Sequence, residues 1–297
     1  MTASSSSTDL RRGCRGFTLV ELAIALLIVG LLLASAMIPI SAQIDIKAAA
    51  DTQRVMDQIR DSLIGFAQAN GRLPCPADPT LASSNASAGQ EAAAKCTLGK
   101  GVIPWAVLGT PEADSWGRRF TYRVAPIFTD TVPGATWNTT ALLDTDLSMT
   151  SAAQSTSCSS PTPTPTLSTF ALCSEGNLSV YTRSGTAHTA SAMALKVALV
   201  IVSHGKNGYG GYTRDGNAIS GVTAGSDEYV NGTGGTTAVA TVPQSFVFIS
   251  RGYTQPPSDG SCNDAAGTDD YCGFDDLVSW VSPTLLVSKM VSAGKLP

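Results

Sequence analysis

The longest hydrophobic run of the chain lies near its N-terminus and predicts a membrane-spanning helix. From Phe17 to Ile38 the only charged residue is Glu21, and three arginines precede the run. Roughly 20 apolar residues suffice to cross a bilayer as a helix, and the arginine-rich flank stays in the cytoplasm. We therefore expect residues 17–40 to span a membrane, with residues 1–16 cytoplasmic and the rest of the chain on the other side.

The helical pattern continues beyond this run. Its apolar positions recur every three or four residues: Val55, Ile59, Leu63 and Phe66. Charged residues occupy the other faces, as in an amphipathic helix with one stripe packed on a sheet. Asn70-Gly71 and then Pro74 favour the end of the helix. One long helix is therefore predicted over residues 17–71.

After residue 72 the pattern changes to β-rich segments separated by turn residues. These segments are Val102–Leu108, Arg119–Val124, Leu178–Thr182, Leu195–Ser203, Ser245–Ser250 and Leu277–Val281. Leu195–Ser203 is apolar on both faces and is predicted to be a central strand. Ser282-Pro283 is a typical helix start, and Gly294 ends that helix. The predicted fold class is α+β, with the long N-terminal helix packed on an antiparallel sheet and a short C-terminal helix.

The head, residues 72–297, contains two segments that we interpret as insertions. Residues 136–170 are rich in Ser and Thr and include alternating prolines, a composition that cannot form a core. Residues 203–236 are rich in glycine and follow the predicted central strand directly. We expect exposed loops in both places.

Composition and charge narrow the class of protein. Charged residues make up 14% of the 297 residues, and the formal net charge is −4. The charged fraction is below the roughly 25% of an average soluble domain, and small and hydroxylated residues take its place. This favours a secreted or surface protein, and the negative charge argues against nucleic acid as a partner.

The cysteines predict disulfides in an oxidising compartment. There are seven, and six of them form three pairs of near neighbours in the sequence. Proximity favours Cys75–Cys96, Cys158–Cys173 and Cys262–Cys272 among the fifteen pairings that six cysteines allow. The alternative is free or metal-binding thiols, but the chain has no C-x-x-C motif and only two histidines, which disfavours zinc.

Glu21 needs a partner or a function, because a lone carboxylate in hydrocarbon costs about 3 kcal/mol or more. Cleavage between Gly16 and Phe17 would create an α-amino group four residues before it. In an assembled filament the amine of one subunit could then neutralise Glu21 of its neighbour, which makes burial of both charges tolerable. The alternative is a Glu21 that lies near the headgroups or is protonated.

The segment Gly16-Phe17-Thr18-Leu19-Val20-Glu21-Leu22, after a short basic leader, resembles the processing motif of type IV prepilins and type II secretion pseudopilins. The resemblance implies that a prepilin peptidase removes residues 1–16 and N-methylates Phe17. It implies other pilin or pseudopilin subunits and an inner-membrane assembly platform as partners. The chain would cross the bacterial inner membrane once, with its head in the periplasm and later in a periplasmic or extracellular filament. Pro39 fits the helix kink of this family.

An ordinary secretory signal is the alternative for this segment. It would be cut after the apolar run, near Ala34-Ser35-Ala36. The length of the run and the carboxylate of Glu21 both oppose this interpretation.

A second resemblance concerns the head. Asp114-Ser-Trp116-Gly117 with Tyr122 is similar to the Asp-x-Trp-Gly…Tyr segment of major pseudopilins. The loop after Ser203 then takes the place of their calcium-binding loop. Candidate calcium ligands in that part of the head are Asp215, Asp227 and Glu228. Asp275-Asp276 could serve the same site or cap the last strand, and solvated acids without a metal are the alternative. No cofactor other than calcium is implied.

An enzyme is not expected. His204 follows a predicted strand, but the chain has no G-x-S-x-G, Walker A or G-x-G-x-x-G motif, so a histidine held in a turn is the better interpretation. Three hypotheses result. The first is a structural, low-copy subunit of a type II secretion pseudopilus or a type IV pilus. The second is a minor tip pilin that binds a surface, a secreted substrate or DNA. The third is a membrane-anchored periplasmic hydrolase.

Overall fold

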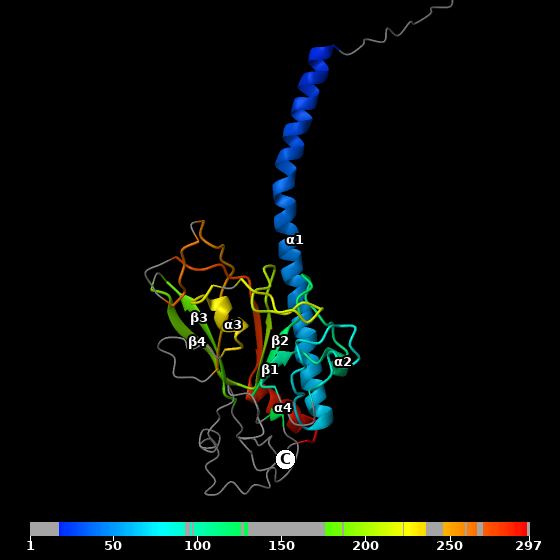
Figure 1. Ribbon diagram of the computed structural model, residues 1–297, viewed down its shortest axis with the longest axis vertical. Coiled ribbons are helices and arrows are strands. Elements are labelled where there is room, and N and C mark those ends of the chain that lie inside the picture. Colours follow the sequence, from blue (N-terminus) through cyan, green and yellow to red (C-terminus); the bar gives the residue numbers. More distant parts are fainter. Residues whose placement is uncertain are drawn as a thin grey trace, which may run out of the picture. The chain divides into compact units, whose positions relative to one another are not determined.

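The computed structural model describes residues 18–92, 96, 98–125, 128–129, 176–185, 187–221, 223–235, 246–258, 260–265 and 270–295, without the side chains of residues 33–42. The chain divides into two compact units, Met1–Lys47 and Ala48–Pro297. Helix α1 (Leu19–Asn70) runs through the boundary between them (Figure 1).

Helix α1 confirms the long helix predicted over residues 17–71. It ends where the sequence indicated: Gly71 has a φ of 73°, and its N–H donates to the carbonyl of Ala67 at 2.8 Å. A left-handed residue at this position closes the last turn of a helix, and glycine adopts this conformation without steric cost.

The buried stripe of α1 lies beside the predicted one. Met56, Ile59, Leu63 and Ala67 are fully buried in the main hydrophobic cluster, whereas Val55 packs against it at the edge. The sequence pattern therefore predicted the helical period and two of the four core residues, Ile59 and Leu63, correctly. The other two predicted residues are each one position before the residue that is buried.

The main sheet has four strands: β1 (Lys100–Val102), β2 (Thr121–Val124), β5 (Leu199–Ser203) and β7 (Leu277–Val281). Their order is β1-β2-β5-β7, and all three pairings are antiparallel. Strand β5 lies between two neighbours and all five of its residues are buried. A strand that is covered on both faces is expected to be apolar throughout, and the interior position predicted for this segment is confirmed.

The main sheet confirms the predicted antiparallel sheet, and a second sheet, which was not predicted, contains one parallel pair. Its three strands, β3 (Leu178–Ser184), β4 (Thr189–Val197) and β6 (Phe246–Ile249), have the order β4-β3-β6. Strands β3 and β4 form an antiparallel hairpin, but β3 and β6 are parallel. A parallel pair requires a crossover connection, and here the chain passes through β4, β5 and α3 (Asp227–Gly232) before it returns.

Two predicted strands are wrong in their limits. Val102–Leu108 holds the last residue of β1 and then helix α2 (Trp105–Leu108), because Pro104 has no N–H for a strand ladder and fits the start of a helix. Leu195–Ser203 is divided between β4 and β5, which belong to different sheets. The break lies at Lys196, whose φ is 56°, and at Ala198, whose N–H donates to Val281.

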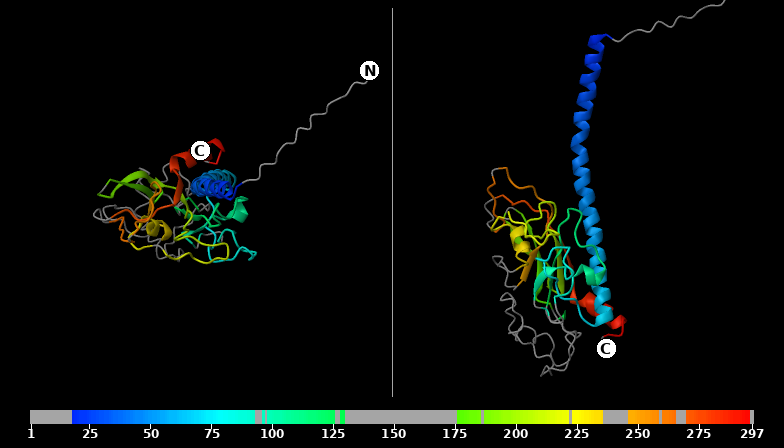
Figure 2. Two further views of the ribbon diagram at one scale, coloured as in Figure 1. Left: turned by 90° about the horizontal axis from the view of Figure 1, so that it is seen from above. Right: turned by 45° about the vertical axis from the view of Figure 1, so that its right-hand side comes forward.

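The C-terminal helix α4 (Pro283–Ser292) confirms the prediction. The hydroxyl of Ser282 accepts the N–H of Leu285 at 3.3 Å, and Pro283 occupies the first turn. Leu286 and Met290 are buried in the same cluster as α1, and Gln68 of α1 donates to the carbonyl of Lys289 at 3.1 Å. In the head, α4 and the C-terminal end of α1 thus lie side by side (Figure 2).

Disulfides join Cys75 to Cys96 and Cys262 to Cys272, as predicted from their proximity. The third predicted pair, Cys158–Cys173, and the predicted insertion at residues 136–170 lie outside the described residues. The other predicted insertion, residues 203–236, is in its described part a folded segment of the head. It contains α3, and its residue Tyr212 forms β-bridges with Arg119 and Ala218.

Candidate functional site

The first candidate site is the start of α1. The N–H of Glu21 donates to Thr18 Oγ1 at 3.3 Å, and the N–H of Leu22 donates to the Thr18 carbonyl at 3.1 Å. Thr18 therefore caps the helix, and the exposed carboxylate of Glu21 lies in the first turn, where the helix dipole favours a negative charge. Gly16 and Phe17 lie outside the described residues, so cleavage and methylation stay predictions.

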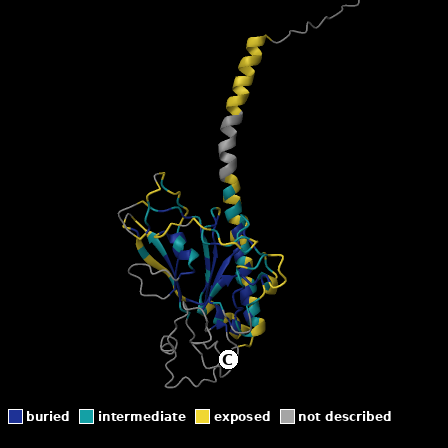
Figure 3. Cartoon of the chain, viewed as in Figure 1, coloured by how far each residue is buried: buried dark blue, intermediate teal, exposed yellow. Residues whose placement is uncertain are grey.

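The first turns of α1 expose a continuous apolar surface. Every large apolar side chain from Leu19 to Leu32 is at least 51% exposed (Figure 3). Contiguous apolar surface of this kind marks a contact with a partner or a membrane. Pro39 lies farther along α1 among the residues whose side chains are not described, and its kink stays a prediction.

Within the part of the chain that the structure describes, no helix is both long and apolar enough to cross a membrane.

The second candidate site is a group of three carboxylates in the head. Glu228 is the second residue of α3, and Asp275 and Asp276 directly precede β7. One carboxylate oxygen from each lies within 4.8 Å of the others. We call Glu228, Asp275 and Asp276 the acidic cluster.

Amide groups hold the acidic cluster in place. The side chain of Asn207 donates to both oxygens of Glu228, at 2.9 and 3.0 Å, and its backbone N–H donates to Asp275 Oδ2 at 2.9 Å. The N–H of Asp275 donates to Glu228 Oε1 at 3.0 Å. Asn231 Nδ2 donates to Asp276 Oδ2 at 2.8 Å. The three carboxylates are thus oriented by groups from three separate segments of the chain.

Two oxygens of the acidic cluster accept no hydrogen bond from the described residues. Asp275 Oδ1 and Asp276 Oδ1 are both buried, and the Asp276 residue is 4% exposed. His204 Nδ1 lies 3.6 Å from Asp276 Oδ1, and its Nε2 is 2.8 Å from Thr121 Oγ1. Buried carboxylate oxygens need a proton or a cation. An all-oxygen set of this kind fits a hard divalent cation such as calcium.

Burial favours the protonated forms of Glu228 and Asp275. Loss of solvent raises the pKa of Glu228 from 4.5 to about 8, and the charges of Asp276 and Asp275 add to this effect. Burial also raises the pKa of Asp275, with the charge of Asp276 acting in the same direction. Like charges that approach this closely cannot all ionise without compensation.

We expect the metal-free chain to lose stability as the pH rises from about 5 to 8. A carboxyl whose folded pKa is raised holds its proton in the folded state across this window, while the unfolded state has already lost it. The contribution is therefore complete below pH 4.5 and is lost as the pH passes 8. One pKa unit corresponds to about 1.4 kcal/mol, so a change of a few kcal/mol is expected in urea unfolding with a chelator. Glu228→Gln should flatten the profile, and an equally steep profile in that variant would contradict the assignment.

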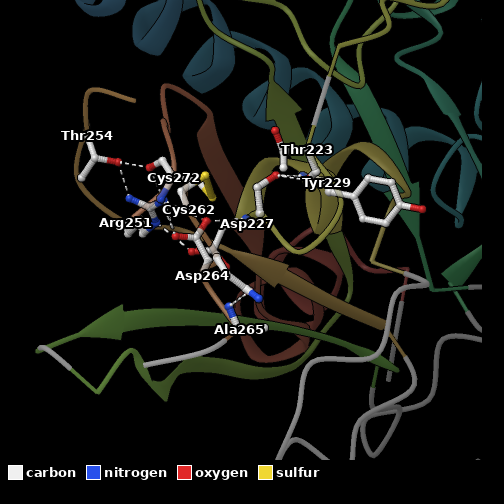
Figure 4. Close-up of a disulfide and its surroundings, with 11 residues drawn as sticks. Thr223, Asp227, Tyr229, Arg251, Thr254, Cys262, Asp264, Ala265 and Cys272 are labelled. Atoms are coloured by element: carbon white, nitrogen blue, oxygen red, sulfur yellow. Dashed lines mark hydrogen bonds and ion pairs between the residues drawn. A yellow bond between two sulfur atoms is a disulfide. The ribbon is translucent and has the colours of Figure 1, made fainter. Parts of the chain in front are cut away.

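The predicted calcium ligands lie in different places. Glu228 belongs to the acidic cluster, together with the Asp275-Asp276 pair, which the sequence analysis considered as further residues of the same site. Asp227 is fully buried, and its carboxylate accepts a hydrogen bond from Arg183 Nε at 2.7 Å. It also accepts one from Arg251 Nε at 2.7 Å (Figure 4). Asp215 is exposed in a turn. The structure thus brings Glu228, Asp275 and Asp276 together, and the candidate ligand set is revised accordingly.

The Asp114-Ser-Trp116-Gly117 segment forms a turn around the buried carboxylate of Asp114. Asp114 Oδ1 accepts the N–H groups of Trp116 and Arg118, at 3.0 and 2.8 Å. Its Oδ2 accepts the hydroxyl of Ser203, the last residue of β5, at 2.6 Å. Burial raises the pKa of Asp114. The segment ties a turn to the central strand and has a structural role.

Sequence reasoning missed several residues of the head that build this region. Asn207 lies inside a glycine-rich segment interpreted as an insertion, and its partners are 21 and 68 positions away in the sequence. His204 was expected in a turn held by backbone hydrogen bonds. Its carbonyl does accept the N–H of Gly208 at 2.8 Å. The sequence did not indicate that its side chain is also fully buried, with its ring nitrogens near Thr121 and Asp276. No spacing rule links such distant positions.

Comparison with known proteins identifies the motif in the N-terminal segment. Residues 11–37 match the family model of the prokaryotic N-terminal methylation motif. No curated protein and no solved structure matches the chain. The motif includes Gly16, Phe17 and Glu21, the residues singled out from the sequence. The chain therefore carries the hallmark of prepilin-type substrates, the class that contains type IV pilins and pseudopilins.

Proposed function

We propose that the protein is a structural subunit of a type II secretion pseudopilus or a type IV pilus, assembled through the first half of α1. The observation that carries the proposal is the methylation motif at residues 11–37. It stands at the start of a helix that exposes apolar side chains along its first turns. Prepilin peptidase, neighbouring subunits and an inner-membrane assembly platform are the partners that this function requires.

The carboxylate of Glu21 gives the assembly its register. Cleavage after Gly16 frees the amine of Phe17, and the apolar surface of α1 becomes buried between subunits or in the membrane. A buried charge is tolerated when an opposite charge matches it. The amine of one subunit and Glu21 of the next supply such a pair at one fixed offset.

A low-copy position in the filament fits this chain best. The head, residues 72–297, is larger than that of a typical major pseudopilin, and a large head would crowd a densely packed filament. Glu21 argues against the very tip, because the subunit that caps the tip commonly lacks this carboxylate. A minor tip pilin that binds a surface, a secreted substrate or DNA is the second hypothesis, and immunogold labelling of filaments separates the two by position.

The proposal includes no catalytic activity. His204 was the one candidate base, and it is fully buried between Thr121 and Asp276. A general base must reach the proton it abstracts from a substrate, and a histidine without solvent exposure does not offer that access. We therefore assign His204 to the support of the acidic cluster.

The proposal is tested by the mass of the mature chain. Expression with prepilin peptidase should yield a chain that begins at an N-methylated Phe17, and expression without it should yield the full-length chain. Intact-mass and N-terminal peptide spectrometry measure both products. An uncut chain, or one cut near Ala36 regardless of the peptidase, would remove the basis for filament assembly.

The head supports a second proposed function, the binding of a divalent cation at the acidic cluster. The favouring observation is the pair of buried carboxylate oxygens, Asp275 Oδ1 and Asp276 Oδ1, that accept no hydrogen bond from the described residues. Glu228, Asp275 and Asp276 would supply three of the six to eight oxygen ligands that calcium takes. Such a cation would neutralise the cluster and fix α3 to the segment before β7.

We expect calcium to stabilise the folded chain at pH 8. Binding at a free concentration 100-fold above Kd adds about 2.7 kcal/mol to the free energy of unfolding. The effect should shrink at pH 5, where protons compete for the same oxygens. Thermal unfolding with calcium or with a chelator measures it. Asp276→Asn should remove the calcium effect, and the exposed Asp215→Asn should keep it; the reverse pattern would reject the revised ligand set.

A further inference from the structure

The Cys262–Cys272 disulfide closes a loop that is tied directly to the start of α3. Asp264 lies within this loop and is fully buried. Its Oδ2 accepts the N–H of Asp227, the first residue of α3, at 2.7 Å, and its Oδ1 accepts the N–H of Cys272 at 3.0 Å. One carboxylate therefore joins the disulfide loop to the N-terminus of the helix (Figure 4).

Arg251 strengthens the same junction. Its Nε donates to Asp227 Oδ2 at 2.7 Å, and its Nη2 contacts Asp264 at 3.2 Å and the Cys272 carbonyl at 3.1 Å. The side chains of all three charged residues are at most 4% exposed. Buried charges of this kind are strongly coupled, because displacing one partner leaves the others without compensation. Movement of the loop would therefore disturb Asp227 as well as Asp264.

The acidic cluster is built on the two elements that this junction connects. Glu228 directly follows Asp227 in α3, and Asp275 lies three residues after Cys272. The two elements meet where the N–H of Asp275 donates to Glu228 Oε1. The position of the disulfide loop thus sets the position of Glu228 relative to Asp275 and Asp276.

We propose that formation of the Cys262–Cys272 disulfide assembles the acidic cluster, so that the affinity of the head for a divalent cation depends on the oxidation of this one cysteine pair. The inference rests on the proposed cation-binding function. Closure removes two protons and two electrons from the two thiols, and a disulfide-bearing oxidant accepts them as two thiols of its own. Such oxidants act outside the cytoplasm, so the head gains its cation affinity only after export.

The test compares calcium binding by the full chain in detergent, measured by isothermal titration. The Cys262→Ser/Cys272→Ser variant should bind calcium about 10- to 100-fold more weakly, which is the usual loss when a group that orients metal ligands is removed. The matched control is Cys75→Ser/Cys96→Ser, which removes the disulfide within the segment that connects α1 to β1. Its affinity should stay within about threefold of the wild type, the scatter to be expected of individual contributions.

A second variant keeps the disulfide and tests the junction itself. Asp264→Ala removes the acceptor for the N–H of Asp227 and should weaken calcium binding to a similar degree. Amide hydrogen exchange without metal, read from peptides over residues 226–231 and 274–277, should be faster in this variant and in Cys262→Ser/Cys272→Ser than in the control. Calcium binding and hydrogen exchange of Asp264→Ala still test the coupling if the Cys262→Ser/Cys272→Ser variant folds poorly.

The outcomes separate the two proposals. A wild-type chain that binds calcium, with equal affinity and equal hydrogen exchange in all variants, overturns the coupling to the disulfide but leaves the cation site standing. A wild-type chain that binds no calcium overturns the proposed cation function and the control of affinity together. Weaker binding in both disulfide variants alike would show a general loss of stability, and it also overturns the specific coupling.

Discussion

Glu21→Ala is expected to abolish incorporation of the subunit into filaments while cleavage after Gly16 continues. The variant leaves the amine of Phe17 in an adjoining subunit without its partner in an apolar environment. Removing one member of a buried ion pair typically costs about 3–5 kcal/mol, and each variant subunit loses the one such pair that its own Glu21 forms. A cost of about 4 kcal/mol corresponds to roughly a thousandfold lower occupancy.

The experiment measures the variant in sheared filament fractions and its N-terminus by mass spectrometry in the same cells. Asp51→Ala is a matched control, because it removes an acid from the same helix where the Asp51–Arg54 pair is solvent-exposed. This control should assemble as the wild type does, since exposed pairs contribute about 0–1 kcal/mol. Normal assembly of Glu21→Ala would show that its carboxylate has no partner in the filament.

Features encoded by neighbouring residues were predictable from the sequence. The end of α1 depends on Gly71, which adopts a left-handed backbone just after the helix. The start of α4 depends on Ser282 and Pro283, one for the capping hydroxyl and one for the first turn. The disulfides Cys75–Cys96 and Cys262–Cys272 likewise follow from cysteines that are close in sequence. In each case the cause and the effect lie within a short stretch of chain.

Features that depend on distant residues were not predictable. After Lys196 the predicted central strand is apolar without interruption from Val197 to Val202. The hydrophobic pattern does not show where the chain changes sheets, because Val197, Ala198 and Leu199 are all buried in one cluster. The parallel pairing of β3 with β6 joins segments about 70 residues apart. The acidic cluster combines a residue of α3 with the two residues before β7. The periodicity of hydrophobic residues does not indicate that these two segments lie close together in the fold.

Arg119 is the clearest example of a residue whose role depends on contacts with distant parts of the chain. The sequence pattern predicted that it starts a strand. In the structure its side chain is fully buried and forms hydrogen bonds with three loops of the head. Its guanidinium donates to Glu112 Oε1, to Ser83 Oγ and to the carbonyls of Pro79, Leu81 and Arg214 at 2.7–3.2 Å. It also lies 4.7 Å from the centre of the Trp105 ring. Five donors in a fixed planar fork are a property of arginine alone.

We expect Arg119→Met to lower the free energy of unfolding by about 3–5 kcal/mol, because it leaves Glu112 and three carbonyls without their donor in a buried site. Arg119→Lys keeps the charge but loses the fork, and it should fall between the wild type and Arg119→Met. Urea unfolding of the three chains at one pH measures the order, provided that the dependence on urea is unchanged. Arg54→Met is the control, since the Arg54 side chain is 76% exposed in its pair with Asp51, and it should change stability by at most about 1 kcal/mol. If Arg119→Met were no more destabilising than Arg54→Met, the loops around residues 79–83, 112 and 214 would not depend on this guanidinium, and packing on Trp105 would have to hold them.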